Sequence, residues 1–452
     1  MKVAALMGFG MLCAVCAAAS MAAGSRETEE YVHVPMPPHF RVEATELDGP
    51  VFADEKGHTL YRWPFKSLRV GNTGDTKGES NCTNTKSTTN AGYMSPYPGG
   101  FTLPDLDQRP SCTQAWPPVL APEKVKPVGK WTVITRKDGR KQWAYDGFPL
   151  YTSILDKLPG DVIGGDSYEH EGDYPAMRIP VQPPADLPPG FNVSTDRVGR
   201  MLLDARRFSI YASDADGSDK SNCDAVCAKN WPPMLAPESA RPHGGDWSIF
   251  ERSPGVRQWA FRKKPLYRSA LDRVSQSVEG SDEPGWHNVY TQLAPPPPAG
   301  FTVQNTSAGL VVSDAAGKSI YMYSCGDDAV DQLGCDHPSE TQAYRLAMCG
   351  AGDPERCLQT FPYVLAGNSA KSASRAWSIV AIDPKTGRIA TKGQLGALRV
   401  WAYRDRPVYT YAGDNQPGDI NADGLGEFRG QREGFRAYWI RDDFNRRTRG
   451  DE

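Results

Sequence analysis

The chain repeats one pattern of aromatic residues and aspartates three times, and this repetition limits the folds open to it. Each copy opens with a Phe after a Pro-rich stretch: Phe40, Phe191 and Phe301. Further along, each copy has a Trp: Trp143, Trp259 and Trp401. A Tyr then precedes an Asp by five residues, in the pairs Tyr151 and Asp156, Tyr267 and Asp272, and Tyr409 and Asp414. Three matches of this length cannot come from composition alone, so we expect one structural unit used three times.

Short runs of β-branched and aromatic residues between polar turns indicate strands in every copy. Thr132-Val133-Ile134 has counterparts in Ser248-Ile249-Phe250 and Ser378-Ile379-Val380. The many Gly (44) and Pro (38) residues favour short elements over long helices. We predict an all-β protein of three tandem antiparallel modules. Because the two halves of each copy are weakly similar, six blade-like units could instead close into a propeller-like ring.

The repeats and the Pro-rich stretches between them predict the domain boundaries. Residues 1–22 form a signal peptide, 23–39 an N-terminal linker, 40–182 repeat 1, 183–190 a Pro-rich linker, 191–294 repeat 2, 295–300 a second Pro-rich linker, 301–441 repeat 3, and 442–452 a charged tail. The copies differ mainly in the segments 66–111, 326–356 and 384–396, which we expect to carry specificity.

The N-terminus predicts export. Lys2 supplies the positive charge of a signal peptide, the residues from Val3 to Ala19 are apolar or small, and Ser20-Met21-Ala22 suits a cleavage point. The apolar stretch is shorter than the ~20 residues of a spanning helix. The residues before Cys13 and Cys16 fit a lipidation signal poorly. We expect a periplasmic or secreted bacterial protein without a transmembrane segment in the mature chain, and lipid anchoring is not favoured.

The mature chain keeps an even number of cysteines, which in an exported protein predicts disulfides. Cys223 and Cys227 lie close enough on a helical turn to pair with each other. By analogy between the copies, Cys82 pairs with Cys112. Cys357 pairs with one of three candidates, Cys325, Cys335 and Cys349. The alternative is a thiolate metal site, but no Cys-x-x-Cys pair supports it.

The repeated Asp of the Tyr-x4-Asp motif is expected just past a strand end. There it can accept backbone N–H bonds in a turn. The alternative is a cation site in the third copy, formed by Asp414, Asp419, Asn421 and Asp423, whose spacing matches the first half of a calcium-binding loop. The twelfth position of that loop is Gly430, so the usual bidentate carboxylate is missing. Calcium is the one cofactor that the sequence suggests.

The other chemistry-bearing residues favour structure over catalysis. The repeated Trp residues are expected in the core or between modules. No nucleophile, zinc or phosphate-binding motif occurs, although a carboxylate pair for glycoside hydrolysis leaves no local signature. The formal charge of −3 and the lack of a basic stripe suggest neither nucleic acid nor an anionic membrane as a partner.

These landmarks resemble the bacterial secreted-repeat family of unknown function, described as predicted lipoproteins with a Tyr-x-aromatic-x-x-Asp motif. The most specific matching pieces are Cys227-Ala-Lys-Asn-Trp231-Pro-Pro, Gln258-Trp259-Ala, and Pro265-Leu266-Tyr267 through Asp272. The residue two after the motif Tyr is Ser153, Ser269 or Tyr411, so only the third copy keeps the aromatic. The resemblance implies export and tandem repetition, and it implies no reaction or ligand.

We therefore expect an exported, non-enzymatic repeat protein that binds a ligand or partner at the bacterial cell envelope. The alternative is a calcium-binding or carbohydrate-active, hydrolase-like extracellular β protein.

Overall fold

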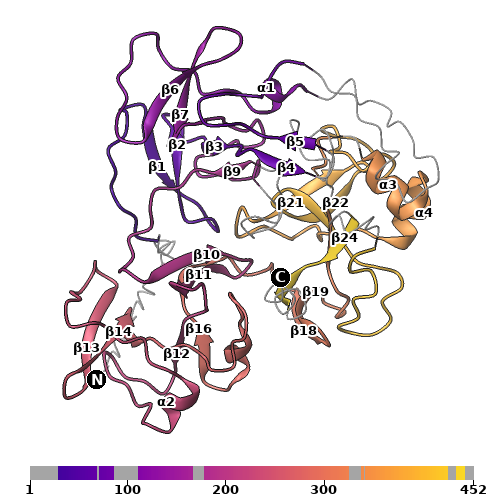
Figure 1. Cartoon of the computed structure of the whole chain (residues 1–452). Coiled ribbons are helices and arrows are strands. Elements are labelled where there is room, and N and C mark those ends of the chain that lie inside the picture. The colour runs from indigo at the N-terminus through magenta and orange to yellow at the C-terminus, as the bar shows by residue number, and fades with distance from the viewer. Residues whose placement is uncertain are drawn as a thin grey trace, which may run out of the picture.

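The computed structural model describes residues 29–68, 71–85, 110–165, 178–324, 337–340, 342–425 and 434–442. Antiparallel strands dominate and helices are few and short, which confirms the all-β class. Figure 1 shows three lobes, in indigo to purple, magenta to pink, and orange to yellow, which follow one another along the chain. The described strands form sheets of two to five strands, and none of these sheets closes on itself. The propeller-like ring is therefore not found in the part of the chain that the structure describes.

Module 1 is built from short antiparallel pairs. Its strands are β1 (Phe40–Ala44), β2 (Pro50–Asp54), β3 (Tyr61–Arg62), β4 (Lys66–Leu68), β5 (Gly71–Thr73), β6 (Trp131–Thr135), β7 (Lys141–Tyr145), β8 (Phe148–Pro149) and β9 (Ile179–Pro180), with helix α1 (Cys112–Ala115). β1 pairs with β2, and β3 pairs with β9. β6, β7 and β8 form one sheet.

Module 2 repeats this order with longer strands. It has β10 (Phe191–Thr195), β11 (Gly199–Asp204), β12 (Tyr211–Ser213), β13 (Trp247–Ser253), β14 (Val256–Phe261), β15 (Lys264–Pro265), β16 (Trp286–Asn288) and β17 (Tyr290–Leu293). The helix α2 (Cys227–Asn230) and the 3₁₀ turn η3 (Glu279–Asp282) complete it. The last strand, β17, returns to the first hairpin and pairs with β11.

Module 3 has the same plan with one added helix. Its strands are β18 (Thr302–Thr306), β19 (Gly309–Ser313), β20 (Tyr321–Ser324), β21 (Trp377–Ile382), β22 (Leu398–Tyr403), β23 (Arg406–Tyr409), β24 (Gly434–Ala437) and β25 (Trp439–Asp442), with helices α3 (Ala343–Gly350) and α4 (Pro354–Thr360). β25 pairs with β19, as β17 pairs with β11 in module 2.

The repeated aromatic residues form equivalent cores. The Phe40 ring lies 4.4 Å from the Trp131 ring, Phe191 lies 4.7 Å from Trp247, and Phe301 lies 5.3 Å from Trp377. The second Trp of each copy meets the same Phe nearly edge-on, at 5.4, 6.0 and 5.9 Å for Trp143, Trp259 and Trp401. Such aromatic pairs add to the free energy gained from burial alone. The Trp residues at these positions thus hold the first hairpin of each module against the second.

The turn after the first hairpin also recurs, but in module 2 it lacks a glycine. Gly57 and Gly317 take the left-handed backbone conformation, with φ of 88° and 83°. Arg207 takes it at the equivalent position of module 2, with φ of 66°. Its N–H donates to the Asp204 carbonyl at 2.9 Å, as the Gly57 N–H donates to the Asp54 carbonyl at 3.0 Å.

Replacing Arg207 with Gly is expected to raise the free energy of unfolding by about 0.5–1 kcal/mol. The left-handed conformation costs an L-residue about 1–2 kcal/mol, and the extra chain entropy of glycine offsets part of that gain. Urea unfolding of the purified protein measures the change. Ala205→Gly in the same turn is the matched control and should give no gain. An equal or lower stability of Arg207→Gly would contradict the prediction.

Candidate functional site

The Asp of each repeated motif accepts a hydrogen bond from a tyrosine on a distant strand. The Tyr61 hydroxyl donates to Asp156 at 2.8 Å, Tyr211 to Asp272 at 2.9 Å, and Tyr321 to Asp414 at 2.7 Å. All three tyrosines start the strand that follows the first hairpin. No local pattern of the sequence pairs these tyrosines with the motif Asp. The bond therefore fastens the motif loop to the sheet in all three modules.

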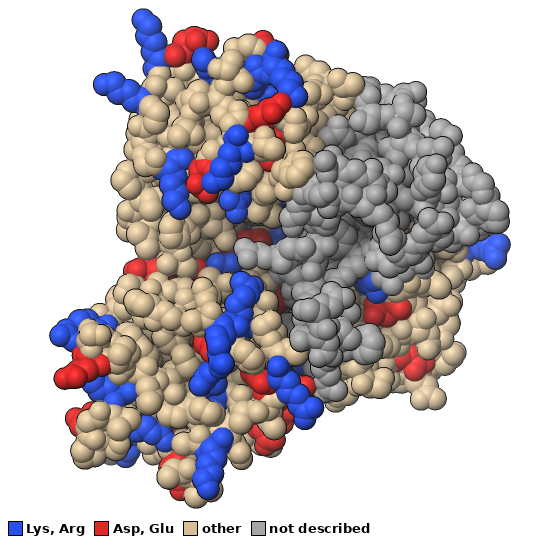
Figure 2. Space-filling view, in the orientation of Figure 1, with Lys and Arg blue, Asp and Glu red and all other residues tan. Residues whose placement is uncertain are grey.

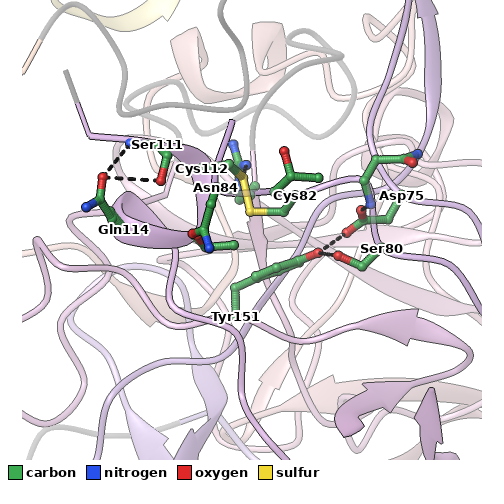
Figure 3. The surroundings of a disulfide bond; sticks show 12 residues. Asp75, Ser80, Cys82, Asn84, Ser111, Cys112, Gln114 and Tyr151 are labelled. Carbon is green, nitrogen blue, oxygen red and sulfur yellow. Dashed lines mark hydrogen bonds between the residues drawn. A yellow bond between two sulfur atoms is a disulfide. The ribbon is translucent and has the colours of Figure 1, made fainter. Parts of the chain in front are cut away.

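The motif tyrosines of modules 1 and 2 bind a different aspartate. Tyr151 donates to Asp75 at 2.8 Å and shares a 2.8 Å bond with Ser80 (Figure 3). In module 2, Tyr267 repeats this with Asp216 and Ser221, both at 2.7 Å. In module 3 the Tyr409 ring lies 4.9 Å from the Tyr363 ring.

Burial changes the titration of these carboxyl groups. Desolvation raises the pKa of Asp156 to about 7, although hydrogen bonds from Tyr61 and the Gly164 N–H act to lower it. Desolvation raises the pKa of Asp272 to about 7 and that of Asp75 to about 6. It also raises the pKa of Asp414. Perturbed carboxyls mark functional sites in some proteins and structural networks in others. Here each of them serves a repeated internal hydrogen bond.

Asp419, the second residue of the predicted calcium site, closes a turn. Its Oδ2 atom accepts the N–H groups of Asn415 and Gln416 at 2.8 and 2.9 Å. Asp161 does the same in module 1, accepting the N–H groups of Lys157 and Leu158 at 2.9 and 2.7 Å. The shared sequence Asp-x-x-Pro-Gly-Asp thus encodes a loop closed by its last carboxylate.

The other three residues of that predicted site also have hydrogen-bonding roles. Asp414 accepts the Asn421 N–H at 3.1 Å, in addition to the Tyr321 hydroxyl. Asp423 accepts the Ala437 N–H at 2.8 Å and the Trp439 indole N–H at 3.3 Å. Within the described ranges no three His, Cys, Asp or Glu side chains meet as metal ligands. In this structure the side chains of Asp414, Asp419 and Asp423 serve these hydrogen bonds, and a calcium site formed by them and Asn421 stays a prediction.

The motif loop lies against the open edge of the first hairpin. A side chain on Gly160 would come 2.4 Å from the Ala44 carbonyl oxygen in β1. A side chain on Gly418 would come 2.5 Å from the Asn305 carbonyl oxygen in β18. Both glycines also have positive φ, at 75° and 82°. The loop can approach the backbone of β1 or β18 because these positions are glycine. It thereby covers edge strands that would otherwise be open to pairing with another strand.

The structure joins Cys82 to Cys112, Cys223 to Cys227, and Cys349 to Cys357. Of the three candidates for Cys357, it therefore selects Cys349, while Cys325 and Cys335 lie outside the described residues. In each module the bonded cysteines adjoin the segment that leads to the repeated Trp116, Trp231 or Phe361.

An arginine network, buried in module 1 and half-buried in module 2, supports two of these disulfide segments and was missed from the sequence. Arg136 donates to the Ser80 hydroxyl at 3.1 Å and to the Cys82 carbonyl at 2.7 Å, and it also contacts Gln142. In module 2, Arg252 donates to Ser221, Gln258 and the Cys223 carbonyl. The corresponding positions of module 3 are Ile382 and Val400, which lie fully buried in an apolar cluster. The sequence does contain a signal for this network: modules 1 and 2 have Arg and Gln at the two positions where module 3 has Ile and Val.

Polar contacts join each module to the other two. Between modules 1 and 3, Arg404 pairs with Asp48 at 3.0 Å, and Glu46 accepts the Ala376 N–H at 2.9 Å. Between modules 1 and 2, Gln292 donates to the Thr45 carbonyl at 2.7 Å. Modules 2 and 3 meet through Arg197, which donates to the Ala437 and Trp439 carbonyls at 3.4 and 3.3 Å.

A pocket of about 370 Å³ lies where the three modules meet. We call it the junction pocket, and its lining comes from all three modules: Glu46, Arg262, Gln292, Leu293, Ala294, Pro295, Ala373 and Ser374. Its size falls in the range of small-molecule sites, which often lie between domains. No motif of the sequence pointed to it, because its lining residues come together only when the modules dock. Elsewhere, on the face in Figure 2, the described Lys and Arg side chains mix with Asp and Glu.

The fold and its bonds define an extracytoplasmic class of protein, a disulfide-bonded β repeat. Two segments, residues 132–167 and 392–432, match the protein family described as secreted repeat of unknown function. Each contains the second Trp, the motif Tyr and the motif Asp of its module, so the family resemblance is confirmed there. No curated protein and no solved structure matches the chain. Among the described residues, no helix has the length and apolar character needed to cross a membrane.

Proposed function

We propose that the protein is an exported, non-enzymatic binding scaffold of the bacterial cell envelope, periplasmic or secreted, which holds a small ligand in the junction pocket. The observation that carries the proposal is the pocket itself, which draws its lining from all three modules. The ion pair between modules 1 and 3 is buried, because the Arg404 side chain is only 4% exposed and the Asp48 side chain only 15%. Such a junction keeps a site preformed, which lowers the entropic cost of binding.

The pocket wall combines charged and apolar groups. The Glu46 carboxylate is held by the Arg375 and Ala376 N–H groups at 2.6 and 2.9 Å. The Arg262 guanidinium is held by Asp246 and by the Thr291 carbonyl, both at 2.9 Å. Leu293, Ala294 and Pro295 add an apolar side. Pockets of this make-up bind ligands through apolar contact and orient them through a few fixed polar groups.

Filling the pocket tests the proposal. A library of small polar and apolar fragments is screened against the mature protein by saturation-transfer NMR. We expect several fragments to bind and Ala373→Trp to abolish their signals, because the indole would occupy the pocket. Ala316→Trp, at another exposed alanine of module 3, is the matched control and should bind like wild type. An absence of hits, or hits equal in both variants, would refute a ligand site here.

A further inference from the structure

The connection between β21 and β22 of module 3 is much longer than its counterparts. It spans residues 383–397, whereas the same hairpin in module 1 is joined by residues 136–140 and in module 2 by residues 254–255. Ordering such an extension costs conformational entropy, and the extension does not enlarge the core in return. Long connections in compact modules are often functional.

This extension is held in shape by its own hydrogen bonds. The Asp383 carboxylate accepts the Lys385 N–H, and the Gly387 N–H donates to the Asp383 carbonyl at 2.8 Å. The Ala390 N–H donates to the Ala381 carbonyl at 2.8 Å, which ties the loop back to β21. A further turn runs from Thr391 to Gln394, with bonds of 3.0 Å in both directions. The side chains that the loop displays are therefore presented from a fixed backbone.

The displayed side chains are apolar and basic. Leu395 is 97% exposed and Ile389 is 46% exposed. Exposed cations flank them at Lys385, Arg388 and Lys392. Asp383 is the single acidic residue of the loop, against three basic ones, and no other Asp or Glu occurs before Asp405. The net charge of −3 for the whole chain conceals this local excess of positive charge.

We propose that this loop, residues 383–397, docks the protein onto an anionic phospholipid bilayer. A leucine that is 97% exposed on an ordered turn matches a deformable interface, into which it can insert, rather than a preformed groove. The surrounding Lys and Arg side chains would remain at the level of the headgroup phosphates, whose negative charge attracts them. The loop thus supplies both the apolar and the electrostatic part of peripheral membrane binding.

Vesicle sedimentation of the mature protein tests the proposal. We expect partition onto vesicles of phosphatidylcholine mixed with phosphatidylglycerol, little partition onto pure phosphatidylcholine, and loss of binding at high salt. Leu395→Ser should weaken partition about tenfold, since it removes the inserted side chain. The double variant Lys385→Gln/Lys392→Gln should weaken it about 25-fold, at roughly fivefold for each cation.

Two controls keep the test specific to the loop. Leu235→Ser removes an exposed leucine from module 2, and Lys137→Gln/Arg140→Gln neutralises the equivalent turn of module 1. Both should bind vesicles like wild type. The proposal is overturned if the wild-type protein does not partition onto phosphatidylglycerol vesicles, if pure phosphatidylcholine binds it equally, or if the loop variants bind as well as these controls. All substituted residues are on the surface, and matching thermal midpoints verify that every variant is folded.

Discussion

The protein is expected to be more stable at about pH 5 than at about pH 8, and Asp156→Asn should remove much of that difference. The Asp156 carboxyl is buried, with a pKa of about 7 in the folded protein against 3.8 as the ordinary value. Between these two values the folded state holds a proton that the unfolded state has lost, so stability falls as the pH rises. Above about pH 7 the carboxylate is ionised in both states and its burial is fully unfavourable.

Between about pH 5 and about pH 8 the expected size is about 2–3 kcal/mol for Asp156 alone, because about two units of its pKa shift lie in this range, at 1.36 kcal/mol for each unit. Asn imitates the protonated carboxyl, can still bond to the Tyr61 hydroxyl, and cannot ionise. Asp272 shifts in the same direction and adds to the slope, as does Asp75. Urea unfolding across this pH range measures the effect, and the variant's curve should be flatter than that of wild type.

Asp138→Asn is the matched control. Its exposed carboxylate has a pKa lowered to about 2, first by the hydrogen bond from Arg140, so it titrates outside this pH range. The control should keep the wild-type slope. A wild-type protein whose stability rises from about pH 5 to about pH 8, or an Asp156→Asn variant with an unchanged slope, would show that the buried carboxyl is not the cause.

Local sequence patterns were enough to predict the strands and the repeated cores. Alternating residues around Trp131 and Trp143 specify a hairpin because the side-chain period of a strand is two. The recurrence of the Trp residues in three copies likewise predicts that they are buried in the core or between modules. The strand predictions need only neighbouring residues, and the Trp prediction needs only the comparison of the copies, so neither requires knowledge of distant contacts.

The contacts of the site could not be predicted in this way. Asp156 bonds to Tyr61, which lies 95 positions away, while local reading considered only the Tyr five residues before it. The calcium site, which stays a prediction, illustrates a related ambiguity. Oxygen-bearing side chains at alternate positions suit a cation, but the same residues also close turns by accepting backbone N–H bonds, as Asp419 does. Asp161 closes the equivalent turn of module 1 in the same way.

Arg136→Ile is expected to lower the free energy of unfolding by about 3–4 kcal/mol, even though the equivalent residue of module 3 is Ile382. Arg136 is buried and donates to Ser80, to Gln142 and to the Cys82 carbonyl. The isoleucine would leave these acceptors without their donor in a dry environment, and each orphaned buried group costs about 1–3 kcal/mol. Thermal and urea unfolding of the single variant measure the loss.

Adding Gln142→Val to Arg136→Ile should recover about 1–2 kcal/mol of the lost free energy of unfolding. The Gln142 side-chain amide, which has lost its donor, is then removed as well. The recovery is partial, because the Cys82 carbonyl still lacks the hydrogen-bond donor that Arg136 supplied. Module 3 accommodates Ile382 and Val400 because its own cluster surrounds them with apolar side chains, including Leu346 of α3 and Leu358 of α4. Ile382→Val serves as the control for apolar trimming and should cost about 1 kcal/mol. If the two module 1 substitutions proved strictly additive, Arg136 and Gln142 would not act as a pair, and the exchange between modules would need another explanation.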